Sequence, residues 1–322
     1  MDYYFAWWNL ENLFDHVDAA RTERLQKAIG SELKGWTEAV LQRKIDQLGS
    51  ILRQMNGGSG PDLLGVCEVE NRAVLDRLVV SLGPLGRDYG VAHHDGTDNR
   101  GIDVAFLYDR DVFTPEEEFS HVILKRSSTR DIFQANFRTD PGRVLSVIGN
   151  HWPSRMGGVY ESEPYRILAG ETLSYWMSRI QELRGADANV LIMGDFNDEP
   201  WDRSLTQYAL STQSRAKVTH ARSPRLYNLM FPIAGAGLGT HYFDNFPAVL
   251  DQLLVSRGIA RTTGEIRVVP DSIEVVRFPE MVVGGTYPAP RRFGRPSKPS
   301  SFDEDGFGDH FPIAVRLHEQ GA

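Results

Sequence analysis

NVLIMGDFNDEP, at residues 189–200, passes from a run of apolar residues directly into a group of oxygen-bearing side chains. The apolar run predicts a buried strand, and Asp195, Asn197, Asp198 and Glu199 follow where that strand reaches the surface. A plain turn explains such residues, because turns favour Asn and Asp for backbone reasons. A site for a hard metal ion also explains them, because such ions prefer oxygen ligands. The rest of the chain has to distinguish these two hypotheses.

Other apolar segments of the chain resemble the run at 189–193. Strands are expected at 3–8, 63–69, 104–108, 144–152, 250–256 and 311–317. Apolar residues spaced three and four apart predict helices at 37–55, near 71–83 and from about Pro164 to Leu183. In the last of these helices, Leu173, Met177, Ile180 and Leu183 are expected to face inward. Strands that alternate with helices indicate the α/β class, with sheets covered on both faces.

The length and composition of the chain limit its organisation. A chain of 322 residues forms one large domain or two ordinary ones. No internal repeat or domain linker is visible, so we expect a single domain over residues 1–322. The segment at about 284–308, which contains PAPRRFGRPSKPSS, is either a flexible surface loop or a basic flap near a phosphate site.

Charge and cysteine content narrow the class further. The net charge of −8 provides no broad basic surface for nucleic acid, although a local basic cleft remains compatible with it. With one cysteine, no intramolecular disulfide can form. No apolar run approaches the roughly 20 residues that span a bilayer, and no signal peptide is visible. We therefore expect a cytoplasmic protein without a membrane span, with secretion as the alternative if the sequence is a trimmed one; we also expect a monomer.

Polar residues recur where the predicted strands end. They are Asn9, Glu11, Asn12, Glu68, Glu70, Asn150, His151, Arg155, Asp195, Asn197, Asp251, Asp309 and His310. Acids and amides beside buried strands are costly unless they are paired or bound to metal. The repetition of this pattern favours a functional site over a set of independent turns.

The donor types at these strand ends indicate the chemistry. Glu68, Asp195, Asn197 and Asp309 are hard oxygen donors without accompanying thiolates, which favours Mg²⁺ or Mn²⁺ over zinc. His310 follows a carboxylate directly in the sequence, and Asp251 is a candidate to orient it as a base. The chain has neither a G-x-S-x-G elbow nor a Walker loop, so water is the expected nucleophile.

Seven motifs, taken in order, resemble the endonuclease/exonuclease/phosphatase superfamily over about residues 5–318. They are WNLENLF, EVEN, NRGIDVAFLY, NHWPSR, GDFND, LDQLLVS and DHFPI. The superfamily includes pancreatic-type deoxyribonuclease, abasic-site endonucleases, inositol polyphosphate phosphatases and bacterial sphingomyelinases, and this chain is most similar to bacterial members described as nucleases. The resemblance implies a four-layer α/β sandwich of two mixed sheets with helices outside. It also implies a helical insertion at about 15–60 and an active site at one end of the sheets.

The resemblance also assigns roles position by position. Glu68, Asn9 and Asp309 would bind the metal, and Asp195 would align or activate the attacking water. Asn197 would hold a phosphate oxygen. His310, paired with Asp251, would contact the phosphate and help to activate the nucleophile, and His151 would stabilise the phosphate or assist the leaving group. The expected substrate contacts are Arg100, Arg155 and Asn150.

Several of these residues have alternative interpretations. Arg100 could form a salt bridge with Asp103 instead of contacting substrate. His93 and His94 either line the cleft or lie in a solvated loop. The two tryptophans Trp7 and Trp8 are expected in the core. Glu11, Glu70 and Asn71 are expected to support the site or to cap a helix.

The favoured hypothesis for function is a metal-dependent phosphodiesterase, a nuclease that cleaves DNA or RNA by in-line attack of water. The alternative is a phosphatase or phosphodiesterase that acts on a small molecule or a lipid head group. The P-[SA]-W-[CT]-D-R signature of inositol phosphatases is absent, which counts against inositol phosphates. A catalytically inactive binding module is a third hypothesis, and the complete set of site residues argues against it.

Overall fold

The computed structural model describes residues 1–284 and 288–321. The predicted basic loop at 284–308 is therefore described except for residues 285–287, which lie outside the described residues. None of the described helices combines the length and the apolar character that crossing a membrane requires.

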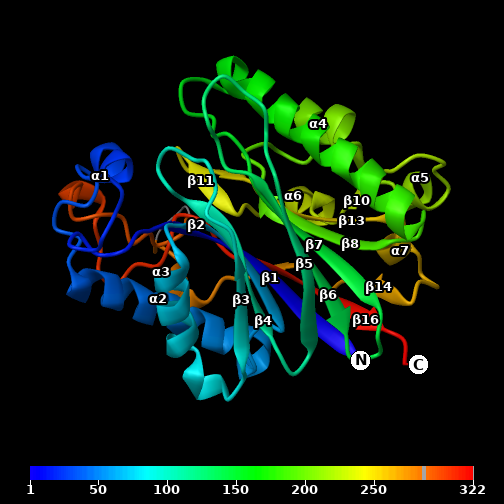
Figure 1. Ribbon diagram of the computed structural model, residues 1–322, viewed down its shortest axis with the longest axis horizontal. Helices are drawn as coiled ribbons and strands as arrows, with labels where there is room; N and C mark the ends of the chain where they lie inside the picture. Colours follow the sequence, from blue (N-terminus) through cyan, green and yellow to red (C-terminus); the bar gives the residue numbers. More distant parts are fainter. Residues whose placement is uncertain (285–287, 322) are drawn as a thin grey trace.

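Two large mixed sheets form the centre of the molecule (Figure 1). Sheet 1 has the order β14 (Ile266–Val268), β16 (Ile313–Glu319), β1 (Asp2–Leu13), β2 (Leu63–Val69), β4 (Asp103–Asp109) and β3 (Tyr89–His93), and β15 (Glu274–Val275) also pairs with β16. Sheet 2 has the order β5 (Phe113–His121), β6 (Ile132–Thr139), β7 (Val144–His151), β8 (Asn189–Asp195), β13 (Asp251–Val255), β10 (Leu226–Asn228) and β9 (Ser211–Thr212). The strands β11 (His241–Phe243) and β12 (Phe246–Ala248) form a separate hairpin.

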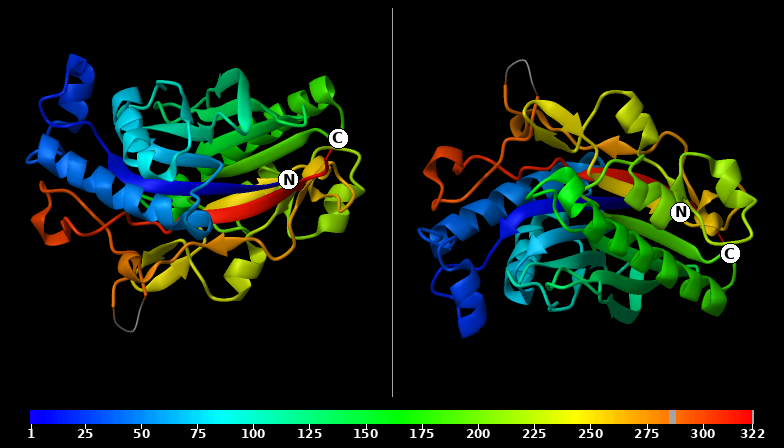
Figure 2. Two further views of the ribbon diagram at one scale, coloured as in Figure 1. Left: turned by 90° about the horizontal axis from the view of Figure 1, so that it is seen from below. Right: turned by 90° about the horizontal axis from the view of Figure 1, so that it is seen from above.

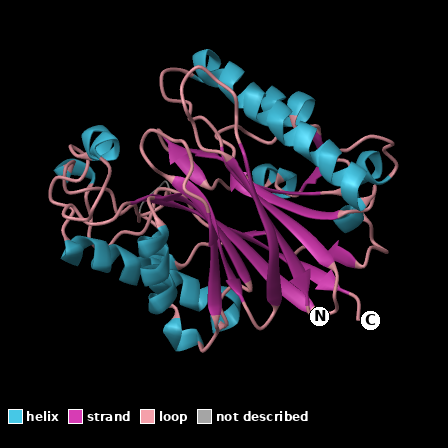
Figure 3. Cartoon of the chain, viewed as in Figure 1, coloured by secondary structure: helices cyan, strands magenta, loops and turns pink. Residues whose placement is uncertain are grey.

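Helices cover the outer faces of both sheets, which gives the four layers that the resemblance implies (Figures 2 and 3). The long helices are α2 (Glu38–Gly58) and α3 (Arg72–Ser81) on sheet 1 and α4 (Val159–Arg184) on sheet 2. The shorter helices are α1 (Glu23–Ile29), α5 (Arg215–Thr219), α6 (Phe231–Gly235) and α7 (Arg257–Ala260). Single turns lie at η1 (Gly83–Leu85), η2 (Ser204–Tyr208), η3 (Pro279–Met281) and η4 (Pro299–Ser301).

Three apolar clusters hold the layers together. The central one lies between the sheets and contains Trp7, Phe106 and Met193. The second joins α2 and α3 to sheet 1, and the third joins α4 to sheet 2. Because both faces of each sheet are packed, the central strands are apolar on both sides, as their sequences indicate. The predicted α/β class is thus confirmed, and so is the four-layer sandwich.

Local sequence explains where the helices begin. Thr37 caps α2 by accepting a hydrogen bond from the Val40 amide, and Asn71 caps α3 in the same way through Val74. The regular part of α2 ends before Met55, because Met55 has an extended ψ angle of 158° and Asn56 and Gly57 adopt positive φ angles of 54° and 63°. The cap expected at Asn71 is therefore present.

Two expectations for α4 were wrong. The helix begins at Val159 and not near Pro164, because the Ser162 amide already donates to the Gly158 carbonyl one turn before the proline. Leu183 is 84% exposed, whereas Leu173, Met177 and Ile180 are buried as expected. At about 100° per residue, Leu183 lies roughly 80° around the helix from Leu173, at the margin of the buried face.

The prediction of a single domain over 1–322 with a helical insertion stays a prediction. α1 and α2 are the helices within the predicted insertion at about 15–60. The two ends of the chain meet in sheet 1, where Asp2 of β1 pairs with His318 of β16.

Candidate active site

The polar strand ends meet at one end of the sandwich. In sheet 2, Asp195 lies in register with His151 on one side and with Asp251 on the other. From sheet 1, the Asn9 side-chain amide reaches sheet 2 and donates a hydrogen bond to Asp195 Oδ2 at 3.1 Å. His310 precedes β16 and reaches the same carboxylate. Strand register therefore brings together residues that are far apart in the sequence.

The Asp195 carboxylate lies at the centre of this group. Its Oδ1 accepts the backbone amide of Asn197 at 2.9 Å. Its Oδ2 lies 3.8 Å from His151 Nε2 and 4.0 Å from His310 Nε2. Both separations exceed the length of a direct hydrogen bond. Burial raises the pKa of Asp195 to about 7, although the nearby His310 opposes this shift.

His310 and Asp251 form a buried dyad. His310 Nδ1 and Asp251 Oδ2 are 2.6 Å apart, and the indole nitrogen of Trp7 donates to Asp251 Oδ1 at 3.0 Å. The backbone amide of Asp251 donates to Thr240 Oγ1 at 3.1 Å. Burial alone would lower the pKa of His310, but the charges of Asp251 and Asp195 raise it well above its usual value. His310 is therefore an imidazolium at neutral pH.

His151, the second histidine of the site, is neutral whereas His310 is charged. His151 is buried, and its burial lowers its pKa well below the usual value, with a further contribution from Arg130 and Arg100. Its Nε2 lies 3.7 Å from Glu68 Oε1, and its Nδ1 has no hydrogen-bond partner within the described chain. His151 is thus neutral, and it faces the same space as the positively charged His310.

The predicted metal ligands suit a hard cation. Glu68 Oε2 accepts a hydrogen bond from the Asn12 backbone amide at 2.8 Å, and Glu68 Oε1 lies 3.7 Å from His151 Nε2. Burial opposes ionisation of Asp309, but the charges of His310 and Arg292 hold its pKa below the usual value, so it remains a carboxylate. Carboxylate and amide oxygens without thiolates fit Mg²⁺ or Mn²⁺.

A second trio, Asp195, Asp251 and His310, offers ligand atoms that lie within 4.8 Å of one another. Both oxygens of Asp251 already accept or face a hydrogen-bond donor, the Trp7 indole and His310 Nδ1. Asn9 Oδ1 is likewise engaged, because it accepts the Glu11 backbone amide at 3.0 Å. The assignment of Glu68, Asn9 and Asp309 as metal ligands stays a prediction.

Several residues at this end of the molecule have strained backbone angles. Glu11, Asn12, Glu68 and Asn197 have φ angles of 51°, 57°, 62° and 51°, in the left-handed region that non-glycine residues seldom adopt. Each such residue costs on the order of 1–3 kcal/mol, and such strain persists where the surrounding structure enforces it.

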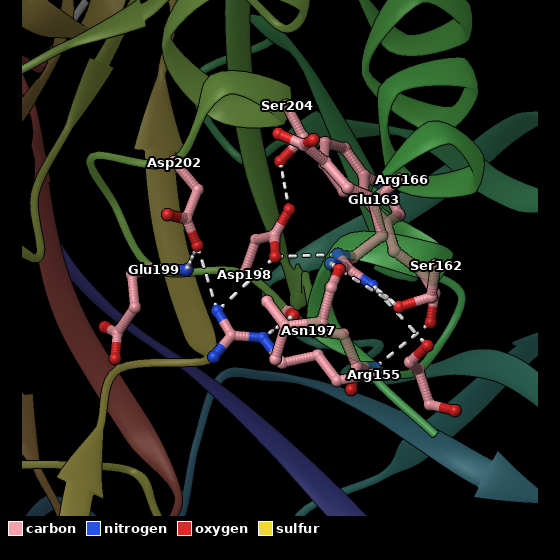
Figure 4. Close-up of polar contacts among 12 residues, drawn as sticks. Arg155, Ser162, Glu163, Arg166, Asn197, Asp198, Glu199, Asp202 and Ser204 are labelled. Atoms are coloured by element: carbon pink, nitrogen blue, oxygen red, sulfur yellow. Dashed lines mark hydrogen bonds and ion pairs between the residues drawn. The ribbon is translucent and has the colours of Figure 1, made fainter. Parts of the chain in front are cut away.

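A buried ionic network supports the loop that follows β8 (Figure 4). Arg166 of α4 is fully buried, and its Nε lies 2.7 Å from Asp198 Oδ1. Arg155 donates from Nε to the Asn197 carbonyl at 2.7 Å and pairs with Asp202 at 2.9 Å. The network therefore holds the backbone of Asn197 on one side of the site.

The three predicted substrate contacts have different surroundings. The Arg155 guanidinium is engaged in the network just described, and the buried Asn150 accepts a hydrogen bond from the Trp152 indole at 3.0 Å. Arg100 contacts Asn12 and lies 3.7 Å from Glu32, so the alternative salt bridge with Asp103 is not formed. The roles of all three in binding substrate stay predictions.

Sequence reasoning missed several residues that surround the site. Trp7 was expected only in the core; it is buried there, yet it also bonds Asp251. Alternation along a strand places Trp7 and Asn9 on one face, which was an available signal. Arg292 was not missed, because it belongs to the segment expected to be a surface loop or a basic flap; it pairs with Glu11 and lies 3.7 Å from Asp309, so this loop reaches the site. The buried Lys44 of α2 donates to the Glu11 carbonyl, and no pattern in the sequence indicated this.

A hairpin adjoins the dyad. The ring of His241 in β11 lies 4.7 Å from the ring of His310, centre to centre. Burial lowers the pKa of His241 to about 4, and the charge of His310 adds to this shift. His241 is thus a neutral ring beside a charged one.

Comparisons with known proteins bear on the family and the fold. The model of the endonuclease/exonuclease/phosphatase family matches residues 4–319. No curated protein matches the chain in sequence.

Several solved structures share the fold. The human Nocturnin catalytic domain, solved with a bound sulfate anion, is 16% identical with a TM-score of 0.53, and the match covers 99% of this chain and 95% of that one. Truncated Caenorhabditis elegans TDP2 is 14% identical with a TM-score of 0.56, covering 98% and 97%. A Bacteroides thetaiotaomicron mannosyl-6-phosphatase is 17% identical with a TM-score of 0.52, covering 98% and 99%. Because the family model spans nearly the whole sequence, the chain belongs to the endonuclease/exonuclease/phosphatase family.

Proposed function

We propose that the chain is a divalent-metal-dependent phosphodiester hydrolase that acts on nucleic acid. The reaction class, metal-dependent hydrolysis of a phosphoester, fits the family to which the chain belongs. The assignment of nucleic acid as the substrate depends on the chemistry of the site.

The observation that carries the proposal is the arrangement around Asp195. Its Oδ2 faces two imidazole Nε2 atoms at 3.8 and 4.0 Å. One imidazole is charged and the other is neutral, and a carboxyl with a pKa of about 7 lies between them. Groups whose environments move their pKa values apart are the usual sign of divided acid and base roles.

Each residue then has a defined task. Asp195 accepts a proton from the attacking water, because a base is most effective when its pKa is near the working pH. The His310 imidazolium, held in orientation by Asp251, stabilises the negative charge that develops on the phosphoryl oxygens. The neutral His151 donates a hydrogen bond to the phosphate or to the leaving oxygen. Asn197 fixes a phosphate oxygen through its amide.

A metal held by Glu68, Asn9 and Asp309 would supply charge neutralisation at the phosphate. Arg292 lies beside Asp309 and Glu11, where it offsets the negative charge of the ligand set.

Cationic residues beyond the reacting centre support a polymeric substrate. Arg100 lies beside Asn12, and the loop that carries Arg291 and Lys298 reaches the site through Arg292. Each phosphate contact to a duplex releases counterions, so a nuclease loses affinity with salt at a log–log slope of about −0.9 per contact.

A small phosphate ester is the second candidate substrate. The net charge of −8 and the pairing of Arg291 with Asp303 and of Arg292 with Glu11 favour it. The similar mannosyl-6-phosphatase structure is compatible with a compact ester as well.

Salt dependence separates the two candidates. With Mg²⁺ or Mn²⁺ present, plasmid DNA, single-stranded DNA, RNA and bis-p-nitrophenyl phosphate would be compared over a range of salt concentrations. A nuclease shows a KM for DNA that rises steeply with salt, whereas hydrolysis of the small diester changes little. Replacing Arg291 and Lys298 by alanine flattens the DNA slope and spares the small ester. DNA that stays intact at every salt concentration, together with fast turnover of a compact phosphate, would reject the nucleic-acid assignment.

A further inference from the structure

A second group of potential metal ligands lies at the edge of sheet 1, apart from the site just described. It comprises His93 at the end of β3, Asp95 two residues later, and Asp103 at the start of β4. These three residues belong to neighbouring strands and to the loop that joins them. One ligand atom from each lies within 4.8 Å of the other two.

The distances between these atoms are close to, or slightly longer than, those between ligands of one cation. His93 Nε2 lies 3.5 Å from Asp103 Oδ2 and 3.9 Å from Asp95 Oδ1. Two atoms bonded to a common cation at about 2.1 Å are roughly 3.0–3.5 Å apart, so small movements bring the three into a coordination sphere. The backbone amide of Gly96 donates to Asp103 Oδ1 at 3.0 Å, which fixes this carboxylate and leaves Oδ2 facing His93.

The imidazole provides an independent sign of an unfilled site. The His93 side chain is only 4% exposed, yet its Nε2 has no hydrogen-bond partner in the part of the chain that the structure describes. A buried polar atom without a partner costs on the order of 1–3 kcal/mol. This nitrogen points at the two carboxylates, and a cation between them would satisfy all three groups.

We propose that His93, Asp95 and Asp103 bind a divalent transition-metal ion such as Zn²⁺, Mn²⁺ or Co²⁺. An imidazole nitrogen with two carboxylates suits these ions better than Mg²⁺, which prefers oxygen ligands throughout. Asp95 is 84% exposed and Asp103 only 7% exposed in their side chains, so the ion enters from solvent at Asp95 and water completes its coordination. This site differs from the oxygen-rich set of Glu68, Asn9 and Asp309 in both position and ligand type.

The ion would fasten a loop that leads to the catalytic centre. Residues 96–102 lie between the ligands Asp95 and Asp103, and this loop carries Arg100, which contacts Asn12 beside Glu68. A cation bound by both Asp95 and Asp103 would join the two ends of this loop and restrict its conformations. Binding at the edge of sheet 1 thus orders the segment that presents Arg100.

Cobalt(II) is a suitable probe, because its binding is followed by visible absorption and by equilibrium dialysis. The full-length chain would be compared with His93→Asn and Asp95→Asn. His94→Asn is the matched control, because it removes the neighbouring exposed imidazole that lies outside the group. Asp95 is solvent-exposed, so its replacement leaves folding intact even if His93→Asn does not.

The proposal expects the unmodified chain and His94→Asn to bind one more equivalent of Co²⁺ than Asp95→Asn and His93→Asn. Loss of a ligand weakens this binding by at least about tenfold. Co²⁺ should also slow amide hydrogen exchange in residues 96–102 of the unmodified chain and the control, but not of Asp95→Asn. Equal stoichiometry and affinity in all four proteins would overturn the proposal. Hydrolysis assays are not needed for this comparison, so its outcome is independent of the proposed function.

Discussion

Replacing Asp251 by asparagine tests the dyad with little change in shape. Asparagine keeps an oxygen that can accept the Trp7 indole hydrogen, which lies 3.0 Å from Asp251 Oδ1. It removes the negative charge at 2.6 Å from His310 Nδ1. The variant therefore removes both the negative charge and the acceptor that hold the imidazolium, because the amide nitrogen that replaces Oδ2 can only donate.

The size of the effect follows from the contact. A hydrogen bond between charged partners contributes about 1.5–3 kcal/mol, and about 1.4 kcal/mol corresponds to one pKa unit, so the pKa of His310 should fall by roughly one to two units. The pKa of His310 is raised in the folded protein, so the imidazolium is present below that pKa and is lost as pH rises through it. The alkaline limb of the rate profile should move to lower pH by the same amount, and kcat should fall by about 10²-fold.

The assay is kcat/KM for bis-p-nitrophenyl phosphate with Mg²⁺ between about pH 5 and pH 10, a range that spans the usual histidine pKa of about 6.5. Trp7→Phe is a useful control, because it removes one hydrogen bond from Asp251 but keeps the charge, and it should shift the limb less. If the dyad acts as one unit, losses in Asp251→Asn and His310→Ala should be non-additive. An unmoved alkaline limb, or additive losses in the double variant, would refute the assigned role of Asp251.

Three further predictions concern stability. Arg166→Met should lower the free energy of unfolding in urea by about 3 kcal/mol, because the buried Asp198 loses the guanidinium at 2.7 Å and keeps the more distant Arg155, at 3.4 Å. Arg179→Met, at a partly exposed position on the same helix, should change it by less than about 0.5 kcal/mol, and equal effects would contradict this. Gly194→Ala places a Cβ atom 2.5 Å from the Asn150 carbonyl oxygen, so it should lower the free energy of unfolding by about 1–3 kcal/mol and reduce kcat. Gly235→Ala places its Cβ atom more than 4 Å from other atoms and should change neither quantity, and a stable, active Gly194→Ala variant would show that the strands can separate. Burial lowers the pKa of His121, so the neutral imidazole contributes to stability above its unfolded pKa of about 6.5, and this contribution is lost as pH falls through the lower folded pKa. The free energy of unfolding of His121→Phe in urea should therefore depend less on pH over this range, and an unchanged pH dependence would exclude His121 as its source.

The strands that the sequence predicted are those with apolar runs. β2 has the bounds expected for it, and β8 extends the predicted run by two residues to Asp195. The search for apolar runs did not predict β5 and β6. β5 is an edge strand that contains Glu116, Glu117 and Glu118, and most of its residues are exposed, so it has no apolar run. β6 buries Gln134 and Asn136, whose side chains hydrogen-bond to each other at 3.0 Å, so its buried positions do not appear apolar in the sequence.

The candidate site was predictable where its residues end strands. His151, Asp195 and Asp251 are brought together by strand register, and each follows or begins an apolar run. Strand alternation places Trp7 on the same face as Asn9, but its hydrogen bond to Asp251 depends on a contact across the sheets. Lys44 was not predictable as a site neighbour, because its role depends on a contact made from a helix. Strand ends indicate where chemistry gathers, but packing decides which core residues support it.

Removal and restoration of the metal test the central claim most directly. Hydrolysis of bis-p-nitrophenyl phosphate would be measured for the unmodified chain and for Glu68→Gln after treatment with EDTA, and again after Mg²⁺ or Mn²⁺ is added. The account predicts that EDTA abolishes turnover, that the ion restores it in the unmodified chain, and that Glu68→Gln recovers only a small fraction at a higher metal concentration. Full activity of the EDTA-treated chain, or full recovery by Glu68→Gln at the same metal concentration, would contradict it.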